Sequence, residues 1–66
     1  MRITLNGETT ELKTALTVEQ LLAEHDLATN KVAVERNLEI VHAIDFGNIV
    51  LEDGDNIEIV HFIGGG

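Results

Sequence analysis

The hydrophobic residues near the start of the chain alternate with polar ones. Ile3 and Leu5 stand between polar neighbours, which is the two-residue period of a strand with one buried face. Asn6-Gly7 follows directly. This dipeptide favours a type I′ turn, because both central positions of that turn need a positive φ. The pattern therefore predicts a hairpin, with a returning strand at about residues 9–12.

A single helix is predicted next. Thr17-Val18-Glu19-Gln20 matches the capping box, in which the Thr hydroxyl accepts from the third helical amide and the Gln side chain reaches back to the cap. Behind this cap, Leu21 and Leu22 continue the helical spacing begun at Val18. We expect a helix over about residues 18–26, and a helix this short needs tertiary packing to be stable.

The second half of the chain is strand-like. The predicted strands are Val32 to Glu35, a short strand at Ile40-Val41 and a last strand from Asn56 to Ile63. Asn37 marks a turn between the first two, and Glu52-Asp53-Gly54-Asp55 marks a turn before the last.

One helix among several strands cannot build a parallel ladder of alternating strands and helices. The pattern therefore predicts an α+β fold, in which one helix packs across one face of a small mixed sheet. We expect the whole chain, residues 1–66, to form one domain with a flexible C-terminal glycine tail at residues 64–66. The residues expected in the core are Ile3, Leu5, Leu21, Val34, Ile57 and Ile59.

The last strand also places apolar residues on the opposite face. Val60 and Phe62 alternate with the core positions and so point away from the helix, with Ile63 beside them. Isolated exposed apolar residues are normal on any protein. Their position beside the C-terminal glycines favours a docking patch, so Val60, Phe62 and Ile63 are the candidate partner-binding residues.

Composition narrows the function. The 66 residues carry 12 acidic and 4 basic side chains, a formal net charge of −8, which disfavours nucleic acid as a partner and favours basic proteins. There is no cysteine, hence no disulfide, which is consistent with the cytoplasm. No signal peptide is apparent, and no apolar run approaches the ~20 residues that span a bilayer, so we expect no membrane partner.

Three glycines, Gly64, Gly65 and Gly66, follow the last strand. Glycines have no side chain to pack and lose much conformational entropy when they are ordered, so they do not stabilise the fold. They can instead extend the C-terminus away from the domain. Three extended residues carry the terminal carboxylate ~10 Å from the body, as a thread without side chains that fits a narrow cleft. A linker remnant is the plain alternative.

Other kinds of site have little support. His25, His42 and His61 lack zinc-type spacing and read as surface residues. The acidic turn at residues 52–55 lacks the EF-hand pattern, so we expect a solvated hairpin turn and no metal. The terminal glycines have no Lys and no helix after them, which excludes a P-loop. No catalytic triad can be argued, so we expect no intrinsic enzyme activity.

At this point the chain resembles the ubiquitin-like β-grasp sulfur carriers, and among them the ThiS type. The resemblance covers nearly the whole chain and rests on the order and spacing of Asn6-Gly7, Thr17-Val18-x-x-Leu21-Leu22, Val32-Ala33-Val34-Glu35-x-Asn37 and the ending Asp53 to Gly66. His42 to Phe46 departs from the pattern, because many relatives have a proline and an arginine there.

The resemblance implies a protein cosubstrate for thiazole synthesis in thiamin biosynthesis. The Gly66 carboxylate, an anion at pH 7, would attack the α-phosphate of ATP in a ThiF-like adenylating partner. A persulfide donor would then replace AMP and leave a thiocarboxylate, whose sulfur passes to a ThiG-like thiazole synthase. ATP is used by the partner, and no cofactor is expected on this chain.

Three alternatives remain open from the sequence. The chain could carry sulfur for molybdopterin, RNA thiolation or cysteine synthesis. It could be a ubiquitin-like modifier that joins Gly66 to lysines of target proteins. It could also be a non-covalent binding module whose glycines are incidental.

Overall fold

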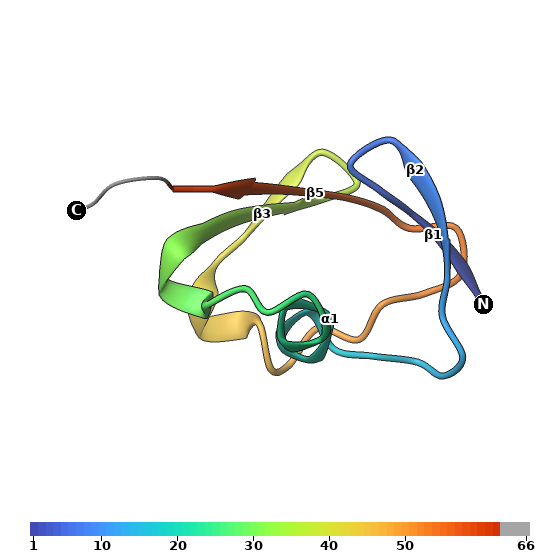
Figure 1. Ribbon diagram of the computed structural model, residues 1–66, viewed down its shortest axis with the longest axis horizontal. Coiled ribbons are helices and arrows are strands. Elements are labelled where there is room, and N and C mark those ends of the chain that lie inside the picture. The colour runs from blue at the N-terminus through green and yellow to red at the C-terminus, as the bar shows by residue number, and fades with distance from the viewer. Residues whose placement is uncertain (63–66) are drawn as a thin grey trace.

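The computed structural model describes residues 1–62 and shows a five-stranded sheet with one α-helix beneath it (Figure 1). The strand order is β2-β1-β5-β3-β4. In chain order the elements are β1 (Arg2–Leu5), β2 (Glu8–Glu11), α1 (Val18–Glu24), η1 (Thr29–Lys31), β3 (Val32–Arg36), β4 (Glu39–Val41), η2 (Ala43–Asp45) and β5 (Asn56–His61). The predicted α+β fold with one helix on a mixed sheet is confirmed.

The N-terminal hairpin has the turn that its sequence predicts. Asn6 and Gly7 have φ angles of 49° and 84°, as a type I′ turn requires. β1 pairs antiparallel with β2 from Arg2↔Glu11 to Leu5↔Glu8. The returning strand therefore begins one residue earlier than expected, at the first residue after the turn.

The capping box also forms. The Thr17 hydroxyl accepts from the Gln20 amide at 3.1 Å, and the Gln20 side chain accepts from the Thr17 amide at 2.9 Å. The helix ends at Glu24, two residues before the predicted end. Asp26 takes a left-handed φ of 57°, and the Leu27 amide donates back to the Leu22 carbonyl at 2.9 Å. This Schellman arrangement stops the helix without the usual glycine.

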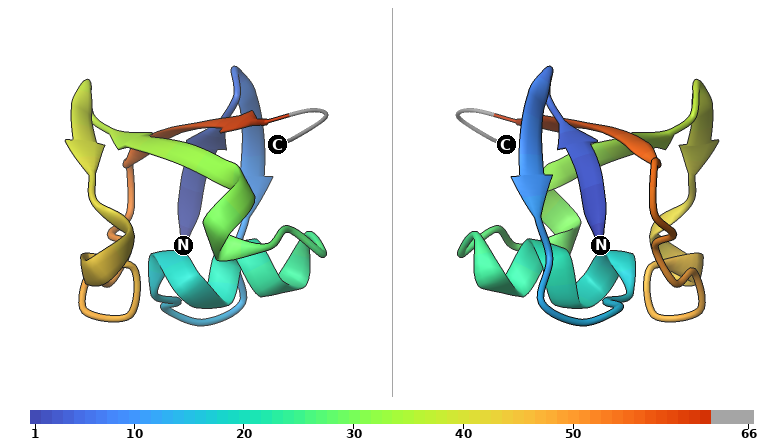
Figure 2. Two further views of the ribbon diagram at one scale, coloured as in Figure 1. Left: turned by 90° about the vertical axis from the view of Figure 1, so that its left-hand side faces the viewer. Right: turned by 90° about the vertical axis from the view of Figure 1, so that its right-hand side faces the viewer.

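The core lies between the sheet and the helix. Figure 2 shows α1 and the connecting segments on one side of the sheet, while residues 1–62 place no helix on the other side. The buried apolar residues are Ile3, Leu12, Val18, Leu21, Leu22, Val32, Val34, Val41, Phe46, Leu51 and Ile57. Of the six predicted core residues, Leu5 and Ile59 are only partly buried and pack at its edge.

The segment between β4 and β5 shows no period because it is a covering loop. Phe46 and Leu51 from this loop are buried in the core. Its backbone also caps the helix, since the Val18 amide donates to the Ile49 carbonyl at 3.0 Å and the Glu19 amide to the Phe46 carbonyl at 2.9 Å. These bonds satisfy two of the amides that a helix N-terminus leaves free.

Leu21→Ala should lower the free energy of unfolding by ~2–5 kcal/mol, because it opens a cavity at a fully buried position. Leu38→Ala is the matched control: Leu38 is exposed, so its truncation should change stability by less than ~0.5 kcal/mol. Urea denaturation of both variants is the measurement. Equal midpoints for the two would mean that α1 does not anchor the core.

Candidate functional site

The strand that leads to the C-terminal glycines is the central strand of the sheet. β5 pairs parallel with β1 through Thr4↔Asn56 and Leu5↔Ile57. On its other side it pairs antiparallel with β3 from Val32↔His61 to Arg36↔Ile57. β5 ends on the side of the molecule opposite the N-terminus (Figure 1). The predicted site residues Ile63, Gly64, Gly65 and Gly66 lie outside the described residues.

A buried carboxylate fixes the start of β5. Asp55 is 6% exposed and accepts three hydrogen bonds, from Arg36 Nε at 2.8 Å, Asn37 Nδ2 at 3.0 Å and the Glu52 amide at 2.8 Å. Asn37 also accepts from the Asn56 amide at 2.9 Å. This network ties the turn after β3 to the chain just before β5.

The sequence-based expectation of a solvated hairpin turn at residues 52–55 is wrong for Asp55. Burial alone would raise the pKa of its carboxyl group, but the hydrogen bonds from Glu52, Arg36 and Asn37 outweigh burial and hold that pKa below its usual range. The turn also joins no hairpin: β5 pairs with β1 and β3, and the chain before the turn makes only an isolated bridge, Thr17↔Val50.

Asn6 holds the middle of β5. β1 ends at Leu5, yet the Asn6 side chain continues its pairing, because Oδ1 accepts from the Ile59 amide at 2.7 Å and Nδ2 donates to the Ile59 carbonyl at 3.3 Å. The side-chain amide thus replaces one backbone unit of the ladder. The asparagine of the turn therefore has a second, long-range role that its place in the Asn6-Gly7 motif does not reveal.

The far end of β5 carries the exposed part of the candidate site. The Phe62 amide donates to the Lys31 carbonyl at 2.8 Å, so hydrogen bonding continues as far as Phe62, the last described residue. Val60 and Phe62 are 61% and 55% exposed. Both residues were expected to point away from the helix, and their exposure agrees with that placement.

Comparison with known proteins identifies the family. The model of the ThiS family matches residues 3–66. The chain belongs to the ThiS family.

Relatives and solved structures agree with this ThiS assignment. The chain is 44% identical to "Sulfur carrier protein ThiS" of Bacillus subtilis, over 94% of this chain and 96% of that protein. A crystal structure of ThiS from Geobacter metallireducens matches with a TM-score of 0.84 and 33% identity, covering 100% of both chains.

Two longer relatives have a different name. The chain is 48% identical to proteins named "Thiazole synthase" from Paramagnetospirillum magneticum and Magnetococcus marinus. The match covers all 66 residues of this chain but only 20% of each of those proteins.

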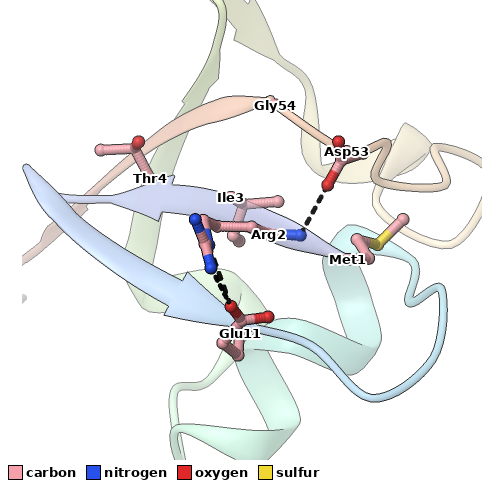
Figure 3. A pocket seen from close by; sticks show the side chains of 7 residues that line it. All are labelled: Met1, Arg2, Ile3, Thr4, Glu11, Asp53 and Gly54. Atoms are coloured by element: carbon pink, nitrogen blue, oxygen red, sulfur yellow. Dashed lines mark hydrogen bonds and ion pairs between the residues drawn. The ribbon is translucent and has the colours of Figure 1, made fainter.

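A polar hollow of this ThiS-family domain lies away from the C-terminal end of β5. It is lined by the start of β1 and by Glu11, Asp53 and Gly54 (Figure 3). Its polar groups bind one another: Arg2 pairs with Glu11 at 2.7 Å, and the Arg2 amide donates to Asp53 Oδ1 at 2.7 Å. The charged side chains of this hollow, Arg2, Glu11 and Asp53, are thus bound within the chain itself.

The three histidines of this ThiS-family fold are all exposed: His25 follows α1, His42 lies between β4 and η2, and His61 ends β5. Within residues 1–62, no group of three or more His, Cys, Asp or Glu side chains is placed to hold a metal ion. In the same part of the chain, no helix has the length and apolar character needed to cross a membrane.

Asp55→Asn should lower the free energy of unfolding at pH 7 by about 1.5–3 kcal/mol, since it weakens charged hydrogen bonds in a buried network. Because the pKa of Asp55 is lowered in the folded state, its contribution is present above the ordinary Asp pKa of ~3.9 and is lost as pH falls through the folded value. Unfolding free energies from pH 7 to pH 2 should therefore fall less steeply for the variant.

The control for this experiment is Asp26→Asn, which removes the same charge from an exposed position and keeps a residue that tolerates a positive φ. It should retain the stability of the parent at pH 7. If Asp55→Asn did the same, the network would not anchor β5.

Asn6→Gly should expose the Ile59 amide to hydrogen exchange, because glycine keeps the turn but removes both side-chain bonds to Ile59. Exchange followed residue by residue by NMR is the measurement. The Asn37 amide, which donates to Asn56 on the other side of β5, is the internal control. Equal protection of Ile59 in variant and parent would contradict the role given to Asn6.

Proposed function

We propose that this chain is a sulfur carrier that supplies sulfur for the thiazole ring of thiamin, as a protein cosubstrate and not as an enzyme. The observation that carries the proposal is the match to Bacillus subtilis ThiS at 44% identity over nearly the full length of both chains. The glycine ending, Gly64-Gly65-Gly66, falls within the part of the chain that the family model matches.

The chemistry needs only the terminal carboxylate from this chain. A Gly66 carboxylate oxygen attacks the α-phosphorus of ATP, and pyrophosphate leaves. The terminal sulfur of a partner's persulfide then attacks the carbonyl carbon and expels AMP. This step forms a carbon–sulfur bond and gives an acyl disulfide that still contains the sulfur–sulfur bond of the persulfide. A second thiol of the partner then cleaves that sulfur–sulfur bond, which leaves the thiocarboxylate on Gly66 and oxidises the partner to a disulfide. The chain contains no cysteine, so the sulfur that is transferred comes from outside it.

The fold supports this role by holding the base of the tail. β5 is fixed at its start by Asp55 and in its middle by Asn6, and Phe62, which follows β5 directly, is held by the Lys31 carbonyl. When a partner binds the folded domain, the C-terminal residues after Phe62 therefore start from a fixed position relative to that partner. Precise placement matters, because displacing a reacting group by ~1 Å can cost ~100-fold in rate.

Two partners follow from the proposal. A ThiF-like adenylating enzyme supplies the ATP site and the persulfide donor, and a ThiG-like thiazole synthase accepts the sulfur. The two longer relatives named thiazole synthase support the second partner, because one polypeptide there includes a segment similar to this chain. The exposed Val60 and Phe62, together with Ile63, are the proposed docking residues.

Removing Gly66 should nearly abolish ATP–pyrophosphate exchange with the adenylating partner while leaving the thermal unfolding midpoint unchanged. The shortened chain still ends in a carboxylate, but the reacting carbon retreats by ~3.3–3.6 Å. Adding one residue after Gly66 should have the same effect. Gly65→Val should also fail, because a β-branched side chain is too wide for a narrow channel.

Pyrophosphate exchange and thermal unfolding should be measured on the same preparations. A loss of both would indicate a folding defect and leave the role of the tail unsupported. Exchange at the rate of the parent in all three variants would show that the tail is a passive end, and the carrier proposal would be wrong.

Phe62→Ala should weaken binding to the adenylating partner by ~1–3 kcal/mol, as expected for an aromatic anchor at an interface. Titration calorimetry gives the affinity, and circular dichroism checks that the fold persists. An unchanged affinity would remove Phe62 from the interface.

A further inference from the structure

The face of the sheet opposite α1 carries an apolar groove bordered by two glutamates. The groove is lined by residues of β3, β4 and β5, namely Ala33, Val34, Glu35, Ile40, Glu58 and Val60. Ile40 is 70% exposed, although it is a large aliphatic residue in a short edge strand. In the described part of the chain, no helix covers this face (Figure 2).

The strand register places the two glutamates directly against each other. Glu35 and Glu58 are Cα partners in the β3–β5 ladder, and Ile40 stands opposite Glu35 in the β3–β4 ladder. The neighbouring residues Val34 and Ile57 are buried, so both glutamates point to the outer face. Like charges directly opposite in a sheet are destabilising.

No ion pair in the described part of the chain neutralises Glu35 or Glu58. The ion pairs within residues 1–62 use Arg2 and Arg36, and neither arginine reaches Glu35 or Glu58. No ion pair within residues 1–62 therefore accounts for placing two glutamates side by side. A cation supplied from outside would remove the repulsion and would be attracted by both carboxylates.

We propose that Glu35, Glu58 and the groove between Ile40 and Val60 form a recognition site for a protein segment that presents an Arg or Lys beside an aliphatic side chain. The cation binds between the two carboxylates, and the aliphatic group fills the groove. This inference rests on the proposed function and assigns the segment to the adenylating partner, because Val60 belongs both to the groove and to the strand that leads to Gly66.

Charge also distinguishes this occupant from others. A second copy of the chain would bring two Glu35–Glu58 pairs together on molecules that each carry a net charge of −8. Nucleic acid and anionic lipid would be repelled in the same way. A basic segment of another protein is the occupant that the charge of this face favours.

The test measures the affinity of the purified adenylating enzyme for the full chain by titration calorimetry at two salt concentrations. The double variant Glu35→Gln/Glu58→Gln should bind at least about tenfold more weakly at low salt, and the difference should shrink at high salt. Its unfolding midpoint should not fall, because the substitution removes a repulsion. Glu8→Gln/Glu24→Gln, which removes two exposed charges from β2 and α1, is the matched control and should bind like the parent.

The apolar part of the site is tested by a second variant with its own control. Ile40→Ala should weaken binding by about fivefold or more, whereas Ile44→Ala should not, although Ile44 is 87% exposed. Ile44 lies in η2, in the layer beneath the sheet and away from the groove. The comparison therefore separates the groove from general surface hydrophobicity.

Parent-like affinity of the Glu35→Gln/Glu58→Gln variant would overturn the proposal. An equal loss in the Glu8→Gln/Glu24→Gln control would do so too, because net charge alone would then explain the effect. A dimer of the parent in sedimentation that Ile40→Ala dissolves would assign the groove to a second copy instead. If the Glu35→Gln/Glu58→Gln variant bound normally while the parent still supported pyrophosphate exchange, only this inference would fail. If the parent itself supported no pyrophosphate exchange, the carrier function would fail and this inference would fail with it.

Discussion

The structure depends on the position of β5 between the two halves of the sheet. The N-terminal hairpin and the β3–β4 hairpin do not pair with each other; each pairs with β5, and Ile57 of this strand is buried in the core. The last strand in the sequence must therefore be in place before the sheet is complete. The same strand leads to the glycines, so the strand that joins the two halves of the sheet is also the base of the proposed reactive tail.

Local patterns predicted much of this fold because short-range physics determines those parts. The turn at Asn6-Gly7 needs only two positive φ angles, and the capping box at Thr17 needs only residues of one helical turn. The mixed sheet with one helix followed from the order of the elements, and the exposure of Val60 and Phe62 followed from strand alternation. The ThiS family was visible in the spacing of these same motifs.

Contacts between residues far apart in the sequence were not predictable in the same way. The acidic turn reads as solvated until Arg36 and Asn37 are seen to surround Asp55. The second role of Asn6 appears only when Ile59 lies beside it, and the pairing of Glu35 with Glu58 requires the register of β3 against β5. The buried Phe46 comes from a loop that follows the surface of the helix and so shows no period.

The central claim is that the Gly66 carboxylate is free and carries sulfur. Intact-mass and C-terminal peptide analysis of the protein from its own cells tests this most directly, with cells deprived of thiamin to increase demand for the carrier. The account predicts a chain that ends at Gly66, with a fraction heavier by the difference between one sulfur and one oxygen atom. A chain that continues past Gly66, or one found only in amide linkage to lysines of other proteins, would contradict it.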